Sequence, residues 1–107
     1  MAIIIRGTTP TITFKFNIVK AEELTAAYLT FKQGNTVVLQ KAFTDATLYD
    51  STHGNALAWT LTQQETLDLY TNPSAKMMLN WKALDGTRGA SEETTVLFAD
   101  NHIPEVI

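Results

Sequence analysis

The sequence has no cysteine, and it contains no long apolar run. Without cysteine the chain has no disulfide framework, no thiolate nucleophile and no zinc site built on cysteine ligands. No apolar stretch approaches the roughly 20 residues that a membrane-spanning helix needs. The opening stretch Ala2–Ile5 is shorter than the roughly 7–15 residues of a signal-peptide core, and no basic residue precedes it. We therefore expect a chain with neither a signal peptide nor a transmembrane segment.

Positive charge is also scarce. Eight Lys and Arg residues stand against eleven Asp and Glu, giving a net charge of −3, and the basic residues are scattered singly. Nucleic-acid-binding surfaces concentrate basic residues on one face, and helices that lie on membranes carry a basic amphipathic face. We therefore expect no nucleic-acid partner and no membrane partner. The length fits one domain over residues 1–107, large enough to bury a core without a metal or a disulfide.

Threonine, by contrast, is abundant, with 17 copies, and its β-branched side chain favours strands. Alternation is clearest from Thr11 to Val19, where every second residue, from Ile12 to Ile18, is apolar and predicted to face a core. The dipeptide Asp85-Gly86 is a strong hairpin signal. Further strands are predicted at residues 2–6, 25–32, 36–43, 46–49, 56–61, 76–83 and 92–99. Together these runs predict an all-β, antiparallel β-sandwich of about seven to eight strands.

One short helix is predicted near residues 63–70. Thr62-Gln63-Gln64-Glu65 matches a capping box, in which the threonine hydroxyl and the glutamate side chain each accept a hydrogen bond from the other residue's backbone N–H. Leu67 and Tyr70, three residues apart, are expected to form its buried side. Asn72-Pro73 is expected to end it.

The aromatic residues suggest one alternative function. Trp59 and Trp81 are in phase with the apolar residues of their strands, so both are predicted to lie in the core. Tyr28 is out of phase and Tyr49 lies at a strand end. Exposed tyrosines of this kind are typical of carbohydrate-binding or cell-adhesion sandwiches, where they form a platform for a glycan.

No catalytic, cofactor-binding or metal site is predicted. His53 lies in a Gly- and Asn-containing loop and His102 in the C-terminal tail, and neither has ligand partners at a recognised spacing. Asp50 shares the loop with His53, and together with Asp100 these residues define a hydrolase hypothesis. No serine or cysteine lies in a nucleophile motif, however, so we expect a protein that is not an enzyme.

The two ends of the chain carry short apolar segments that are candidate partner contacts. An exposed strand edge can pair within its own fold or add to the sheet of a neighbour. The first segment is expected to pair mainly within the fold, whereas the second is less committed. The candidate contact residues are Ile3, Ile4, Ile5, Ile103, Val106 and Ile107.

Three stretches together resemble a known family. They are the opening I-x-R-G-T-T-P-T from Ile4 to Thr11, the central L-A-W-T-L-T-Q-Q-E-T-L, and the late D-G hairpin. They resemble roughly 100-residue structural proteins encoded in the tail or baseplate regions of phages and prophages of Firmicutes. More distantly, the chain is similar to the immunoglobulin-like N-terminal domain of phage upper-baseplate proteins. The loop around His53 departs from the family pattern.

The resemblance implies an immunoglobulin-like sandwich with a structural role. Its expected function is a non-enzymatic assembly component of a phage or prophage tail or baseplate, made in the bacterial cytoplasm and incorporated into the virion. Expected partners are other tail or baseplate proteins, or further copies of this chain, because such proteins form repeated contacts around a ring or fibre. The motifs that carry the resemblance are structural, so it implies no cofactor and no catalytic residue.

Overall fold

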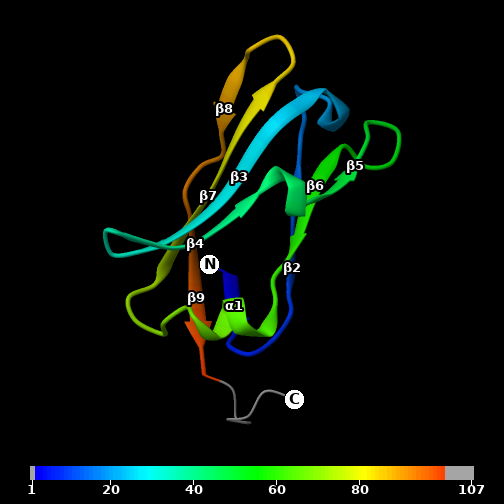
Figure 1. The fold of residues 1–107 in the computed structure, drawn as a ribbon. Coiled ribbons are helices and arrows are strands. Elements are labelled where there is room, and N and C mark those ends of the chain that lie inside the picture. The colour runs from blue at the N-terminus through cyan, green and yellow to red at the C-terminus, as the bar shows by residue number, and fades with distance from the viewer. Residues whose placement is uncertain (1, 101–107) are drawn as a thin grey trace.

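The computed structural model describes residues 2–100, which form two packed β-sheets and one short α-helix (Figure 1). Two single 3-10 turns, η1 (Ala21–Glu23) and η2 (Phe43–Asp45), join strands. The helix α1 covers Gln63–Leu67. The strands are β1 (Ala2–Ile5), β2 (Thr11–Lys15), β3 (Leu24–Gln33), β4 (Thr36–Ala42), β5 (Thr47–Tyr49), β6 (Ala56–Thr60), β7 (Ala75–Ala83), β8 (Arg88–Ala90) and β9 (Thr94–Ala99).

The large sheet has the strand order β1-β9-β7-β3-β4, with β8 paired to the end of β7, and the small sheet has the order β2-β6-β5. The fourth strand, β4, extends the sheet that holds β7 and β9, as added strands do in variable-type immunoglobulin domains. The predicted all-β, immunoglobulin-like sandwich is therefore confirmed. The described residues form nine strands, because β8 precedes β9 as a separate strand in the last hairpin.

The opening strand pairs within the fold. β1 lies parallel to β9, with Ile4 opposite Phe98, and every other strand pair among the described residues is antiparallel. Since β1 joins the large sheet and β2 the small one, the chain crosses between the sheets in the five residues from Arg6 to Pro10.

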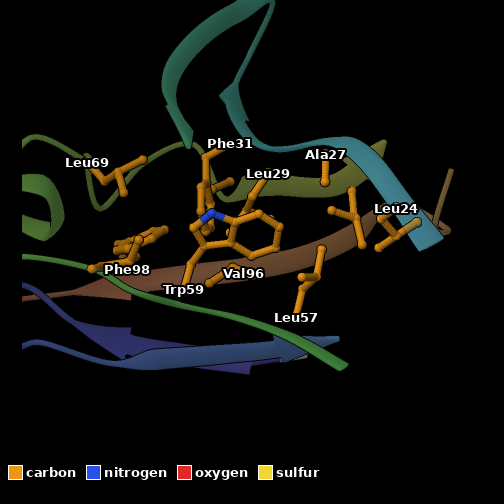
Figure 2. Close-up of a cluster of buried hydrophobic side chains, with 12 residues drawn as sticks. Leu24, Ala27, Leu29, Phe31, Leu57, Trp59, Leu69, Val96 and Phe98 are labelled. Carbon is orange, nitrogen blue, oxygen red and sulfur yellow. The ribbon is translucent and has the colours of Figure 1, made fainter. Parts of the chain in front are cut away.

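The core lies between the two sheets (Figure 2). Alternating residues of β3, including Leu29 and Phe31, face Leu57 and Trp59 of β6, and all four are fully buried. The Trp59 indole Nε1 donates to the carbonyl oxygen of Ala42 at 2.9 Å, so the buried polar atom is satisfied. The predicted core position of Trp59 is confirmed.

The helix α1 begins as predicted but buries a different side. Thr62 and Glu65 form the reciprocal capping box. Thr66 and Leu69 are fully buried, whereas Tyr70 is 62% exposed and Leu67 only partly buried, so the predicted buried pair is wrong. One reason is that the helix already ends at Leu67, before Tyr70. The other is that its buried residue, Thr66, is polar and is held by hydrogen bonds, which an apolar pattern does not reveal.

Those partners lie in the crossing between β1 and β2. The Thr66 hydroxyl accepts from the backbone N–H of Gly7 at 3.0 Å and lies 2.9 Å from the carbonyl oxygen of Thr8, to which it can donate. Gly7 has a φ of 81°, a conformation that favours glycine. Arg6 adds bonds from Nη2 to the carbonyl oxygen of Leu67 at 2.7 Å and from Nη1 to Asp100 at 2.9 Å. The opening loop is thereby clamped onto α1.

An ion pair ties α1 to β4 on the other side. Lys41 Nζ lies 2.8 Å from Glu65 Oε2, and both side chains are largely buried. Burial raises the pKa of Glu65, but hydrogen bonds from Lys41 and from the Thr62 backbone outweigh it, so the pKa lies below its usual value. The carboxylate is therefore held ionised in the folded state.

The buried Gln33 fixes the loop after α1. Its Nε2 donates to the carbonyl oxygens of Tyr70 at 2.6 Å and Pro73 at 2.8 Å, and its Oε1 accepts from the backbone N–H of Tyr70 at 2.9 Å. Gln33 is only 5% exposed, so one side chain satisfies three backbone groups that a strand would otherwise have to pair.

Replacing this glutamine tests the role of its amide. We expect Gln33→Met, which keeps the length but removes every hydrogen bond, to lower the free energy of unfolding by about 2–4 kcal/mol, because buried backbone groups lose their partners. The matched control is Gln40→Met on the exposed face of β4, expected to change it by less than about 0.5 kcal/mol. Urea unfolding measures both, and equal effects would contradict the assigned role.

Candidate functional site

An apolar cleft of about 450 Å³ lies at one end of the sandwich. It opens between the end of β2 with its following segment and the hairpin of β7 and β8, at the opposite end of the molecule from α1 (Figure 1). Most of its wall is apolar. The lining residues are Phe14, Lys15, Phe16, Asn17, Ile18, Val19, Leu79, Trp81, Thr87, Ala90 and Ser91.

Two aromatic rings meet across the cleft. The ring centroids of Phe16 and Trp81 are 6.2 Å apart with an interplanar angle of 89°, an edge-to-face contact between the two sheets. Trp81 lies opposite Gly89 in the β7–β8 pair, and a Cβ added at Gly89 would overlap the indole ring. The ring therefore packs directly against the β8 backbone at Gly89. Trp81 packs against the core but is only partly buried, so the prediction that it lies in the core is confirmed only in part.

A break in the last hairpin shapes the far wall. Residues 91–93, between β8 and β9, belong to neither strand. There Ser91 bonds to Leu79 twice: its backbone N–H donates to the carbonyl oxygen at 2.8 Å, and its Oγ accepts from the backbone N–H at 2.9 Å. Because a side chain replaces part of the strand pairing, β8 and β9 pair with β7 as two separate segments.

Asn55 fixes the other wall. Its Nδ2 donates to the carbonyl oxygens of Phe16 at 2.7 Å and Val19 at 3.0 Å, and its Oδ1 accepts from the backbone N–H of Ala21 at 2.7 Å. These bonds bend the chain out of β2 after Lys15, so the predicted strand to Val19 is too long. Ile18 was expected to face the core, but in the bent segment it is 97% exposed.

The cleft is bordered by an open edge of β2. The carbonyl oxygen of Pro10 and the N–H of Phe16 both bond toward β6. Backbone groups of an antiparallel strand alternate in direction, so those of Thr13 and Lys15 point the other way. Within residues 2–100 no strand pairs with that edge.

The edge of β8 is open as well. Thr87 and Ser91 direct backbone groups to β7, so the alternation points those of Arg88 and Ala90 away from it. No other strand in the described part of the chain lies beside β8. The cleft is thus an apolar slot between two open strand edges, one from each sheet, which is the geometry that accepts an added strand.

The predicted contact residues that the structure describes all lie on β1. Ile3 and Ile5 of β1 are 63% and 38% exposed, while Ile4 packs against the core. Ile103, Val106 and Ile107 lie outside the described residues.

The two predicted glycan-platform residues do not share a sheet. Tyr28 is on β3 of the large sheet and is 47% exposed, whereas Tyr49 is on β5 of the small sheet and is 43% exposed. Tyr28 borders a shallow hollow of about 220 Å³ that also contains Asn80, Lys82 and Arg88. Tyr49 is not among the residues that line it.

The hydrolase residues meet only in part. His53 Nδ1 lies 2.6 Å from Asp50 Oδ1, and the same nitrogen lies 2.9 Å from the Thr52 hydroxyl. The hydrogen bond from His53, followed by that from Thr52, lowers the pKa of Asp50 below its usual value. A catalytic triad uses the two different ring nitrogens, so this arrangement cannot relay a proton between hydroxyl and carboxylate. Asp100 instead bonds to Arg6.

The remaining contacts of this loop are structural. The Glu22 carboxylate accepts from the backbone N–H of Ser51 at 2.9 Å and from its hydroxyl at 2.8 Å, which ties the loop to η1. No group of three or more His, Asp or Glu side chains suited to hold a metal occurs within residues 2–100. No helix in that range is long and apolar enough to cross a membrane.

The cleft was missed by the sequence reasoning because Phe16 and Trp81 were both assigned to the core. A usable signal was the glycine opposite a tryptophan in the hairpin, since Gly89 marks a place where a ring lies against the backbone.

A methyl group at Gly89 should disturb this wall. We expect Gly89→Ala to displace Trp81 and to lower the free energy of unfolding by about 1–3 kcal/mol, because overpacking forces the ring or the strand to move. Iodide quenching of tryptophan fluorescence should rise, since Trp59 is fully buried and the displaced ring is Trp81. The neighbouring Ala90→Ser serves as the control and should leave both readouts unchanged; an unaltered Gly89→Ala protein would contradict the packing.

No family model matches this chain, and no curated protein has a significantly similar sequence.

Proposed function

We propose that this protein is a non-enzymatic structural component of a phage or prophage tail or baseplate and acts through protein–protein contacts. The observation that carries the proposal is the apolar cleft between the open edges of β2 and β8. Open strand edges beside apolar surface favour pairing with another chain, and soluble proteins usually cover or charge them. A building block whose strand edges are covered by its neighbours in an assembly does not have to protect them itself.

The family resemblance supports the same role. Its two main segments, residues 4–11 and 61–67, touch each other through the bonds of Thr66 to Gly7 and Thr8. They form one structural unit, the clamp that sets the crossing between the sheets. Because the resemblance lies in the segments that form this clamp, it is consistent with the same sandwich fold in the family. The clamp contains no group arranged for catalysis.

The remaining parts of the proposal follow from the assembly role. The protein is made in the bacterial cytoplasm and enters the virion, its partners are other tail or baseplate proteins or copies of itself, and it needs no cofactor. A low, mixed surface charge suits packing against protein rather than nucleic acid.

A carbohydrate-binding or adhesion module is the second candidate, and the hollow beside Tyr28 favours it. An exposed aromatic ring near an amide and two cationic side chains, Asn80, Lys82 and Arg88, offers stacking and hydrogen bonds to a sugar. A glycan-array signal abolished by Tyr28→Ala but kept by Tyr49→Ala would support this candidate, because only Tyr28 lines the hollow.

The assembly role is tested in the source bacterium. Particles released on prophage induction are purified by density gradient, and their proteins are quantified by mass spectrometry. We expect this chain in the particle fraction at several copies per particle, with particles lost or defective when its gene is deleted. A chain that stays in the unassembled cell extract, with normal particles in the deletion strain, would contradict the proposal.

A further inference from the structure

We propose that residues 103–107 of one copy bind a second copy by adding an antiparallel strand to the open edge of β2. In this arrangement Pro104 and Val106 fill the apolar cleft of the second copy. The inference rests on the proposed function, because it names the contact by which copies of this chain join. It commits to one occupant of the cleft, the C-terminal segment of another copy.

The shape and lining of the cleft favour binding of an extended apolar segment. Its 450 Å³ are lined mostly by apolar surface, and Ile18 is fully exposed at the rim. The adjoining backbone groups of Thr13 and Lys15 have no strand to pair with among the described residues. A strand laid there satisfies the backbone and covers the apolar wall at once. The sequence IPEVI, residues 103–107, is short, apolar and has a single charge.

The same molecule cannot supply this strand. In the antiparallel pair of β7 and β9, Val96 lies opposite Ala75. Asp100 follows Val96 by four residues, and Leu79 follows Ala75 by four residues in the opposite direction along the sheet. At about 3.3 Å per residue, these two levels are roughly 26 Å apart along the sheet. β2 runs away from α1, so an antiparallel partner with Glu105 opposite Lys15 must begin with Ile103 at the far end of the cleft. The three residues from Asp100 to Ile103 reach at most about 11 Å even when fully extended, so they cannot place Ile103 there. The donor must be another copy.

Proline fixes how the segment would pair. Pro104 has no N–H to donate, so its position in the strand must be one whose backbone hydrogen-bonding groups point away from β2. The N–H and C=O groups of its two neighbours, Ile103 and Glu105, then point toward β2. In an antiparallel pair, residues that bond to each other place their side chains on the same face. The partners Thr13 and Lys15 point outward, so Glu105 also points outward, and Pro104 and Val106 point into the cleft.

Charge then selects the register. Lys15 is the exposed cation on the β2 edge, and Glu105 is the one charged residue of the segment. Placing them opposite each other makes a cross-strand ion pair. The same register puts Thr13 opposite Ile107.

Such a contact is head-to-tail. The donor segment follows Asp100, which bonds to Arg6 beside α1, whereas the acceptor cleft lies at the other end of the sandwich. A contact between two different surfaces repeats from copy to copy and closes into a ring or continues as a fibre. Both outcomes suit a tail or baseplate component.

Engineered cysteines test the register directly, because the natural chain has none. A Thr13→Cys protein is mixed with an Ile107→Cys protein under mild oxidation, and disulfide-linked dimers are counted on non-reducing gels. We expect the mixed dimer to form readily. The matched control pairs Ile107→Cys with Thr47→Cys, an exposed threonine on the opposite edge of the small sheet, and should yield about tenfold less dimer.

A second measurement uses the charge of a single side chain. Val106→Asp should weaken self-association of the full chain by about tenfold or more in light-scattering titrations, because the cleft would bury a carboxylate. His102→Asp, which adds the same charge outside the paired segment, should have little effect. Equal cross-linking at Thr47, no cross-linking at Thr13, or self-association unchanged by Val106→Asp would each overturn the inference.

The outcomes separate the inference from the proposed function. A chain found in purified particles that fails the cysteine test is a tail component joined by another surface, such as the exposed isoleucines of β1. A chain that is not found in particles but passes the test has the strand-exchange contact without the proposed biological role.

Discussion

The hydrogen bonds of the Thr66 hydroxyl are the contact on which the rest of the structure depends. They hold the loop from Gly7 to Thr8 against α1 and so fix where the chain crosses from the large sheet to the small one. Because the crossing occurs at the α1 end, β1 covers the β9 edge only there. At the other end the edges of β2 and β8 stay uncovered, and the cleft opens between them. One clamp thus determines both which end of the sandwich is closed and which is open.

Single polar side chains make similar connections elsewhere. Gln33 satisfies the loop after α1, Asn55 bends the segment after β2, and Ser91 separates β8 from β9. Each replaces strand pairing with side-chain bonds, which lets a short chain change direction without leaving buried backbone groups unpaired. Two of the three, Asn55 and Ser91, shape the walls of the cleft, so the same device that completes the fold also forms its binding surface.

Sequence reasoning recovered what depends on local pattern. The alternation of β3 and β6 placed Leu29, Phe31 and Trp59 in the core, and the capping box at Thr62 marked the start of α1. It failed where a distant polar contact overrides the pattern: Asn55 turns Ile18 out of the core, and Thr66 replaces the predicted buried residues of the helix. The cleft could not be predicted either, since it arises from two edges that lie far apart in the sequence.

The open edge of β2 is the central claim, and backbone amide exchange in the dilute, monomeric protein tests it most directly. Ile12 and Phe14 are directed at β6, whereas Thr13 and Lys15 face the uncovered side. The account predicts that the amides of Thr13 and Lys15 exchange at least about a hundredfold faster than those of Ile12 and Phe14. Equal protection of all four amides would show that the edge is covered within the monomer and would contradict the account.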